Sequence, residues 1–438
     1  MVIPRDRLLF WVGALLPFCA LAALVPAAIA VTVVLTVALF VAAVADAVLA
    51  VIHTRGVSVA LPDVVRASRT RATEIPVAIH NGKMRALEME IGLPLPPAVG
   101  SENDTMRVTV PQGCIESDIP WPCRPKKRGS FGVRQCHFAI RSPLGLWNAT
   151  GTTSCMSEIR VYPDLVGERR ALAALFLNRG VFGLHSQRMI GQGRDFEKLR
   201  KYLPGDSFDD VHWKATAKRG YPVTKLYQVE RTQEIYVVLD SSRLSGRTVG
   251  SQSALERFIT SALVLGLVAE RQGDLFGVMT FSDRIRRFIR AGGGKAHYNT
   301  CRDALFTLTP ESASPDFGEL CSFIRLKLRR RALIMILTDL GDPVVAESFL
   351  SNIDLVSGQH VVLVSMLKQQ AVQPLFSEEI DPSADLYDKL SGHMIWHDLR
   401  ELGRSLHYHG ARLSLVEDEK LSTDLVTQYM SVKARQLL

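Results

Sequence analysis

The N-terminal region is the most apolar part of the chain, and Asp46 is the only charged residue between Leu8 and Ile52. One straight helix of that length would reach about 68 Å, roughly twice the ~30 Å hydrocarbon core of a membrane. The pattern therefore predicts a transmembrane helical hairpin over residues 1–55, broken near Pro26. A secretory signal peptide is the alternative, but its apolar core would end after ~7–15 residues, and this one continues.

Basic residues flank the hairpin: Arg5 and Arg7 precede it, His53 and Arg55 follow it, and the turn carries no charge. Because basic flanks stay on the cytoplasmic side, we expect an anchor in the inner (cytoplasmic) membrane with all soluble parts facing the cytoplasm. Asp46 lies within about two turns of the inner end of the second helix. Its carboxylate is therefore expected near the lipid headgroups.

Between residues 56 and 165 the pattern changes to short segments of alternating apolar and polar residues, separated by turns rich in Pro and Gly. These segments are "VSVALP", "IPVAIHN", "LEMEIGLPL", "MRVTVP", "FGVRQCHFAI" and "EIRVYP". Alternation of this kind predicts an antiparallel β-sandwich. Residues 166–230 follow as a linker that contains an unusual charged stretch at 191–220.

From residue 231 to 438, the apolar runs "EIYVVLD", "LFGVMTF", "ALIMILTDL" and "HVVLVSML" alternate with helical patterns. Such runs suit parallel strands covered on both faces, so they predict an α/β doubly wound sheet. Ligands of these sheets bind at the carboxyl ends of the strands. Those ends carry Asp240, Ser242, Ser282, Asp283, Thr338 and Asp339.

The run "DSSRLS" after the first strand resembles the D-x-S-x-S metal loop of von Willebrand A domains. The resemblance implies oxygen ligands for Mg²⁺ from Asp240, Ser242 and Asp339, with a threonine from another loop, for which only Thr300 is available. Leu244 stands where that loop has its second serine. We therefore expect a von Willebrand A-like fold that keeps the loop and needs no cofactor, with bound Mg²⁺ as the alternative.

The stretch 191–220 predicts two short helices around a turn. Phe196, Leu199 and Leu203 share one face of a helix over Asp195–Leu203, and "LPGD" forces the turn. The second helix is expected to end at Gly220. Trp213 is expected on the side of this helix that faces the core. A metal site at Asp206, Asp209, Asp210 and His212 is one alternative, and a nucleic-acid surface is another; a docking surface for protein fits the mixed charges better.

The segments "GQGRDFEKLRKYLPGD" and "VHWKATAKRG" resemble a bacterial family named domain of unknown function 58. The positions that carry the resemblance most clearly are Asp195, Phe196, Arg200, Tyr202, Pro204, Gly205, Asp206, Trp213 and Lys214. The resemblance implies a membrane-anchored protein with a von Willebrand A-like domain, often encoded beside MoxR-type AAA+ ATPases. It implies no reaction.

The predicted function is therefore that of a membrane-anchored adaptor that cooperates with a MoxR-type AAA+ ATPase in complex assembly or envelope maturation, with the nine positions above as its interaction motif. The chain has no Walker A, H-E-x-x-H or G-x-S-x-G motif, so no catalytic residue is predicted. A net charge of +8, spread along the chain, gives no reason to expect nucleic acid as a partner. A metal-dependent hydrolase or transferase using Asp240, Ser242 and Asp339 is one alternative function, a structural envelope scaffold is another, and the oligomeric state stays open.

Seven cysteines are present, and none forms a C-x-x-C pair. Four of them lie between Cys114 and Cys155, a clustering that would suggest disulfides in an exported protein. With a cytoplasmic orientation we expect free thiols.

Overall fold

The computed structural model describes residues 1–26, 28–101, 103–179, 190–191, 195–204, 206–228, 233–250, 252–369, 372, 374 and 386–435. The chain divides into two compact units, Met1–Asp164 and Leu165–Leu438.

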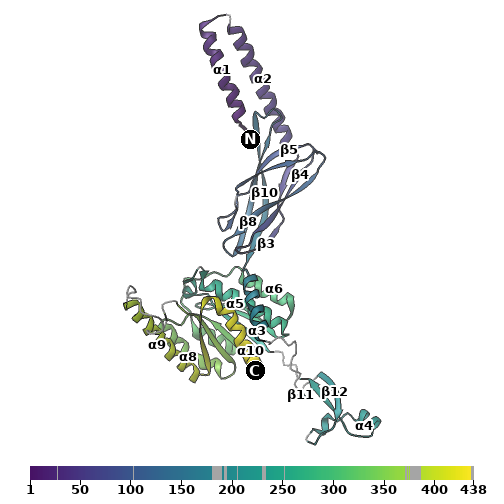
Figure 1. Ribbon diagram of the computed structural model, residues 1–438, viewed down its shortest axis with the longest axis vertical. Helices are drawn as coiled ribbons and strands as arrows, with labels where there is room; N and C mark the ends of the chain where they lie inside the picture. The colour runs from purple at the N-terminus through teal and green to yellow at the C-terminus, as the bar shows by residue number, and fades with distance from the viewer. Residues whose placement is uncertain are drawn as a thin grey trace. The chain divides into compact units, whose positions relative to one another are not determined.

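The first unit begins with an apolar hairpin. A short strand β1 (Val2–Pro4) leads into helix α1 (Asp6–Leu24), which is followed by helix α2 (Ala28–Thr54) (Figure 1). Both helices are long and apolar enough to cross a membrane, and most of their large side chains are exposed in the protein alone. The two helices associate the chain with a membrane, as the hydrophobic pattern predicts.

Two sheets make up the rest of this unit. One has the order β1-β10-β9-β5-β7 with β3 also beside β10, and the other has the order β2-β4-β8-β6. The strands are β2 (Val57–Ala60), β3 (Val64–Ser68), β4 (Thr73–Asn81), β5 (Leu87–Gly92), β6 (Val99–Gly100), β7 (Thr105–Val110), β8 (Glu116–Pro125), β9 (Gly129–Arg141) and β10 (Trp147–Tyr162). Alternate residues such as Val77 and Trp121 from one sheet and Met89 and Ile140 from the other are buried in one shared core. This is the arrangement of a β-sandwich, with β3 pairing parallel to β10.

The second unit opens with helix α3 (Val166–Arg179) and a small sheet of order β11-β13-β12. Its strands are β11 (Ile190–Gly191), β12 (Asp195–Lys201) and β13 (Val223–Gln228), and helix α4 (Trp213–Arg219) lies between β12 and β13. The helix predicted over Asp195–Leu203 is therefore wrong, because this segment pairs antiparallel with β13. Three apolar residues cannot fix a helical period, and pairing with a partner strand overrides local preference. We call residues 195–228, apart from residue 205, the motif module.

The main sheet of the second unit has the order β18-β17-β14-β19-β20-β21, and every pair is parallel except β17 with β18. Its strands are β14 (Glu234–Asp240), β17 (Leu275–Phe281), β18 (Ile285–Gly292), β19 (Leu333–Leu337), β20 (Val361–Leu367) and β21 (Ala411–Val416). Its helices are α5 (Ala254–Arg271), α6 (Gly294–Leu305), α7 (Phe317–Lys327), α8 (Pro343–Ser357), α9 (Leu386–Tyr408) and α10 (Leu421–Ala434).

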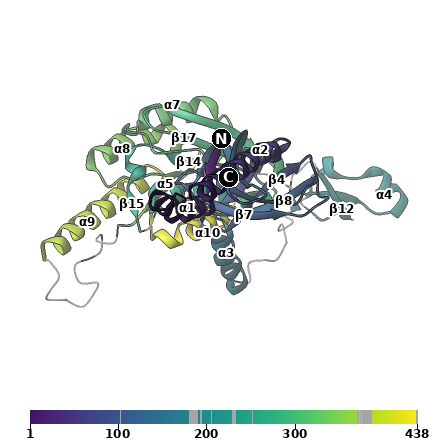
Figure 2. The ribbon, with the colours of Figure 1, turned by 90° about the horizontal axis from the view of Figure 1, so that it is seen from above.

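Helices cover both faces of this sheet. Val237 and Leu239 of β14 are buried in one core with residues of α5 and α10, whereas Tyr236 and Val238 are buried in another core with residues of α7 and α8. Figure 2 shows α7 and α8 on one side of β14 and β17. The fold is the predicted von Willebrand A-like doubly wound sheet.

Candidate functional site

At the carboxyl end of β14, Asp240 is fully buried and both of its carboxylate oxygens accept hydrogen bonds. The Oδ1 atom accepts from the Ser242 backbone N–H at 2.8 Å, and Oδ2 accepts from the Thr338 hydroxyl at 2.6 Å. Burial raises the pKa of Asp240, and the hydrogen bonds from Thr338 and Ser242 oppose that shift. The Ser242 side chain is buried too, and it caps the short helical turn that follows.

Asp339, after β19, is held by an arginine of the same chain. Its Oδ2 lies 2.8 Å from Nη1 of Arg247, and its Oδ1 accepts the Gly341 backbone N–H at 3.0 Å. The Asp339 side chain is only 12% exposed, so the guanidinium covers much of what a ligand could reach.

A second arginine pairs with two further acids, one after β17 and one after α6. The Arg286 guanidinium forms ion pairs with Asp283, at 2.8 Å, and with Glu311. The Ser282 hydroxyl donates to Asp283 at 2.9 Å, and this bond, together with the charge of Arg286, lowers the pKa of Asp283. The acids at this edge of the sheet are therefore matched by groups of the same chain.

These contacts fit Mg²⁺ poorly. Each oxygen of Asp240 already accepts one hydrogen bond, and the guanidinium of Arg247 beside Asp339 would repel a divalent cation. Thr300, the threonine suggested by the sequence, is exposed on α6 and bonds to its own helix, while the threonine beside Asp240 is Thr338. Within the described ranges no group of three or more His, Cys, Asp and Glu side chains is placed to hold a metal ion.

The motif module is organised around Asp206. Its carboxylate accepts from the Arg200 guanidinium at 2.7 Å, from the Leu203 backbone N–H at 3.0 Å and from the Thr224 hydroxyl at 3.2 Å. These bonds tie the turn after β12 to both strands of the hairpin. Arg200 and Asp206 thus hold the shape of the module.

Two further contacts fix helix α4 in the module. His212 accepts the Ala215 backbone N–H at 3.0 Å and so caps the start of α4, and the Thr216 hydroxyl accepts from the Val223 backbone N–H at 3.0 Å. Gly220 ends the helix at φ 72°, in the left-handed conformation, as predicted.

The surface of this rigid module carries large apolar side chains. Trp213 is 67% exposed, so the prediction that it lies in the core is wrong: α4 turns its first residue to solvent, and Val211 and Val223 are buried instead. Phe208, Leu203 and Tyr221 are exposed as well.

The remaining motif residues take different places. Lys214 and Pro204 are exposed, the Tyr202 ring lies 6.0 Å from that of Phe208, and Asp195 and Phe196 are residues of β12. Gly205 lies outside the described residues.

A third feature is the junction of the hairpin with the sandwich. Asp46 of α2 is fully buried, and it accepts hydrogen bonds from the Ser142 hydroxyl at 2.6 Å and from the backbone N–H groups of Leu144 at 2.9 Å and Leu146 at 3.1 Å. The Trp147 indole donates to the Ala43 carbonyl at 2.8 Å. Asp46 therefore faces the β9–β10 loop, and the prediction of a carboxylate among headgroups is wrong.

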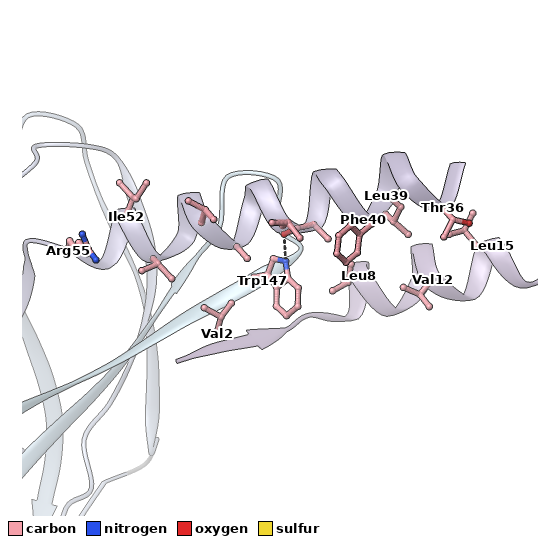
Figure 3. Close-up of a pocket in the computed structure, with 15 residues that line it drawn as sticks. Val2, Leu8, Val12, Leu15, Thr36, Leu39, Phe40, Ile52, Arg55 and Trp147 are labelled. Atoms are coloured by element: carbon pink, nitrogen blue, oxygen red, sulfur yellow. Dashed lines mark hydrogen bonds between the residues drawn. The ribbon is translucent and has the colours of Figure 1, made fainter. Parts of the chain in front are cut away.

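An apolar cavity of about 970 Å³ runs along this junction. Figure 3 shows the Trp147 ring beneath α2, with Leu8 and Phe40 toward one end and Arg55 at the other. Apart from Thr36, Arg55 and the indole, its lining is apolar. It suits contact with hydrocarbon and offers no group for catalysis.

The sequence did not predict the ion pair of Arg247 with Asp339 or the hydrogen bond of Thr338 to Asp240. It also did not predict that Phe208 is exposed or that Asp46 contacts the β9–β10 loop. The signal for Thr338 was its place next to Asp339 at a strand end. No sequence spacing signals Arg247 or residues 142–146, because the fold alone brings them to their partners.

The doubly wound sheet with its antiparallel edge strand, preceded by an apolar hairpin, defines a membrane-associated protein with a von Willebrand A-like domain. Residues 198–375 match the sequence model of the family described as "Protein of unknown function DUF58", so this part of the chain is similar to that family. The match confirms the resemblance carried by the motif. No curated protein matches the chain.

Among solved structures, the chain is similar to the conserved hypothetical protein BatB from Bacteroides thetaiotaomicron, at 15% identity and TM-score 0.30 over 46% of this chain and 99% of that chain. The chain is also similar to an aerotolerance-related membrane protein from Bacteroides fragilis NCTC 9343, at 14% identity and TM-score 0.28 over 45% of this chain and 97% of that chain. A third similar structure is the SpRpn10 VWA domain, at 10% identity and TM-score 0.28 over 45% of this chain and 95% of that chain. None of these likenesses brings an activity to this chain.

Proposed function

We propose that this chain is a membrane-anchored adaptor that binds a partner protein through its motif module. The observation that carries the proposal is the 67% exposure of Trp213 on a helix whose start and end are both fixed. Tryptophan is the residue type most often found at the energetic centre of protein interfaces, and a rigid support lowers the entropy lost on binding.

The basic residues beside Trp213 define the kind of partner. Lys214, Lys218 and Arg219 of α4 are exposed, and Arg200 is held in its pair with Asp206. An exposed tryptophan on a helix that also carries exposed lysine and arginine suits a partner surface with an apolar pocket and acidic residues near it. We propose a MoxR-type AAA+ ATPase at the cytoplasmic side of the inner membrane as this partner, acting in complex assembly or envelope maturation.

The proposal includes no chemical step and no bound cation. Its support is the internal pairing of the acids at the sheet edge, above all the contact of Arg247 with Asp339. A hydrolase or transferase that used Asp240, Ser242 and Asp339 would need these groups free to meet a substrate or an ion.

The test measures binding of the purified full chain, in detergent, to a purified MoxR-type ATPase of the same organism. We expect Trp213→Ala to weaken binding about tenfold or more, because truncation of a central tryptophan typically costs ~2 kcal/mol or more. Lys214→Glu should weaken binding to a smaller degree, with a change in salt dependence.

Met156→Ala is the matched control, since Met156 is 93% exposed on β10, outside the module. It should bind as the wild type does. Equal binding by wild type, Trp213→Ala and Lys214→Glu would contradict the proposal.

A further inference from the structure

The last strand of the main sheet, β21, has an open side. The sheet order ends at β21, and of the described strands only β20 pairs with it. An open edge presents unpaired backbone N–H and C=O groups, which form a template for one more strand. Natural proteins usually cover such an edge or protect it with charge.

Beside this edge, α9 and β21 form a groove of about 650 Å³. Leu413 and Leu415 of β21 and Trp396 of α9 contribute apolar surface, and the Arg400 guanidinium lies 5.3 Å from the Trp396 ring centre. The groove therefore combines a strand edge with a partly apolar floor.

Positive charge dominates the rim. Arg400, Arg404 and Arg412 line the groove and are exposed, and no carboxylate is among the lining residues. No described acid forms an ion pair with any of the three arginines, in contrast to Arg247 and Arg286 on the same domain. Three arginines without an ion-pair partner among the described residues, two on α9 and one on β21, call for an anionic partner.

Gly403 keeps the groove open. It faces β21 from the middle of α9, and a Cβ atom added there would lie 3.9 Å from Cδ2 of Leu413, in ordinary contact. Glycine lowers the stability of a helix interior, so α9 loses helix stability at a position that faces Leu413 across the groove.

We propose that an extended, acidic segment of a partner protein binds here as a strand beside β21. Its backbone pairs with the open edge, and its acidic side chains on the α9 face meet Arg400 and Arg404, while Arg412 adds positive charge along β21 itself. This surface lies outside the motif module, so the proposal does not depend on the function assigned to Trp213.

The test uses the full chain in detergent and a fluorescein-labelled, end-capped octapeptide that alternates Glu and Thr, followed by fluorescence anisotropy. We expect the wild type to bind this peptide and not the same peptide with Lys in place of Glu. Arg404→Glu should weaken binding about tenfold or more, since it replaces attraction by repulsion. Arg325→Glu, an equal charge change at an exposed site on α7, should leave binding unchanged.

Two further reagents separate strand addition from charge attraction alone. Gly403→Met keeps every charge but fills the groove, and it should weaken binding about tenfold while the melting temperature stays the same or rises, because methionine favours a helix interior. A peptide with alternate amides N-methylated loses its backbone donors, and it should bind about tenfold more weakly. The proposal would be overturned if Gly403→Met bound the acidic peptide as tightly as the wild type does and the wild type bound the N-methylated peptide equally tightly.

A second copy of this chain is the competing occupant. A dimer that Arg404→Glu dissociates, in a protein that does not bind the acidic peptide, would overturn the proposal in favour of self-association. We expect instead that the peptide binds and that the mass of the protein–detergent particle does not depend on Arg404.

Discussion

At the scale of single residues, arginines form ion pairs with the acids at the sheet edge and so limit their access to ligands. Arg247 is close to Asp240 in sequence but pairs with Asp339, from another strand, and no spacing rule predicts that contact. The sequence correctly marks Asp240, Thr338 and Asp339 as strand-end residues, because an apolar run followed by polar residues fixes where a strand ends. It cannot say which of these side chains are paired.

Cysteines also illustrate the residue scale, since all seven are free thiols and five of them are buried. Burial raises the pKa of Cys301 and Cys321 to about 12. A thiol with a raised pKa stays protonated below that pH, and the thiolate is the reactive form. We expect N-ethylmaleimide at pH 8 to modify Cys301 and Cys321 only after unfolding.

Intact-protein mass spectrometry in detergent, before and after denaturation, counts the modified thiols. Cys114→Ser serves as a control, because Cys114 is partly exposed and its loss should remove one native modification. Modification of Cys301 or Cys321 in the folded protein would contradict the burial seen here.

At the scale of elements, apolar runs and alternation predict most strands, and the exceptions have physical causes. Strand β8 contains Pro120 and Pro122, which argue against a strand because proline cannot donate to a neighbour. Their outer side is left unpaired, since the short β6 pairs only with Arg124 and Pro125. Helix α9 and strand β21 follow a segment without a clear period, so the pattern alone does not predict them.

The contact of α2 with the β9–β10 loop gives a prediction at this scale. Asp46→Ala removes the acceptor of three hydrogen bonds and leaves two backbone N–H groups and the Ser142 hydroxyl without a partner. The Ser142 hydroxyl and the Leu146 N–H are buried. Each unsatisfied buried group costs ~1–3 kcal/mol, so we expect the free energy of unfolding of the first unit to fall by about 2 kcal/mol or more. Denaturant titration in detergent, followed by tryptophan fluorescence, measures it.

Asp104→Ala is the control for this variant, because Asp104 is an exposed carboxylate of the same unit. Its unfolding midpoint should match the wild type. If Asp46→Ala unfolds at that midpoint as well, the hydrogen bonds of Asp46 do not stabilise the junction.

At the scale of the whole molecule, the distribution of charge beside the hairpin decides on which side of the membrane the soluble units lie. Arg5, Arg7 and Arg55 flank the two helices, and the turn near Pro26 is uncharged. The positive-inside rule predicts that both units face the cytoplasm. Protease added to intact spheroplasts should leave them uncut, whereas inverted membrane vesicles should lose them.

Permeabilised spheroplasts, in which the protease reaches both sides, are the control and should show full cleavage. Cleavage in intact spheroplasts would place the units outside and would also reopen the question of disulfides among the four cysteines from Cys114 to Cys155.

The junction at Asp46 has a mechanical consequence. The sandwich is joined to the hairpin at α2 through Asp46 and again at the start of α1, where the Arg5 backbone N–H donates to the Leu146 carbonyl and β1 pairs with β10. With two separate attachments, a torque on the sandwich is transmitted to both helices and is not absorbed by swivelling about a single covalent link. Any partner that twists this unit therefore twists both helices with it.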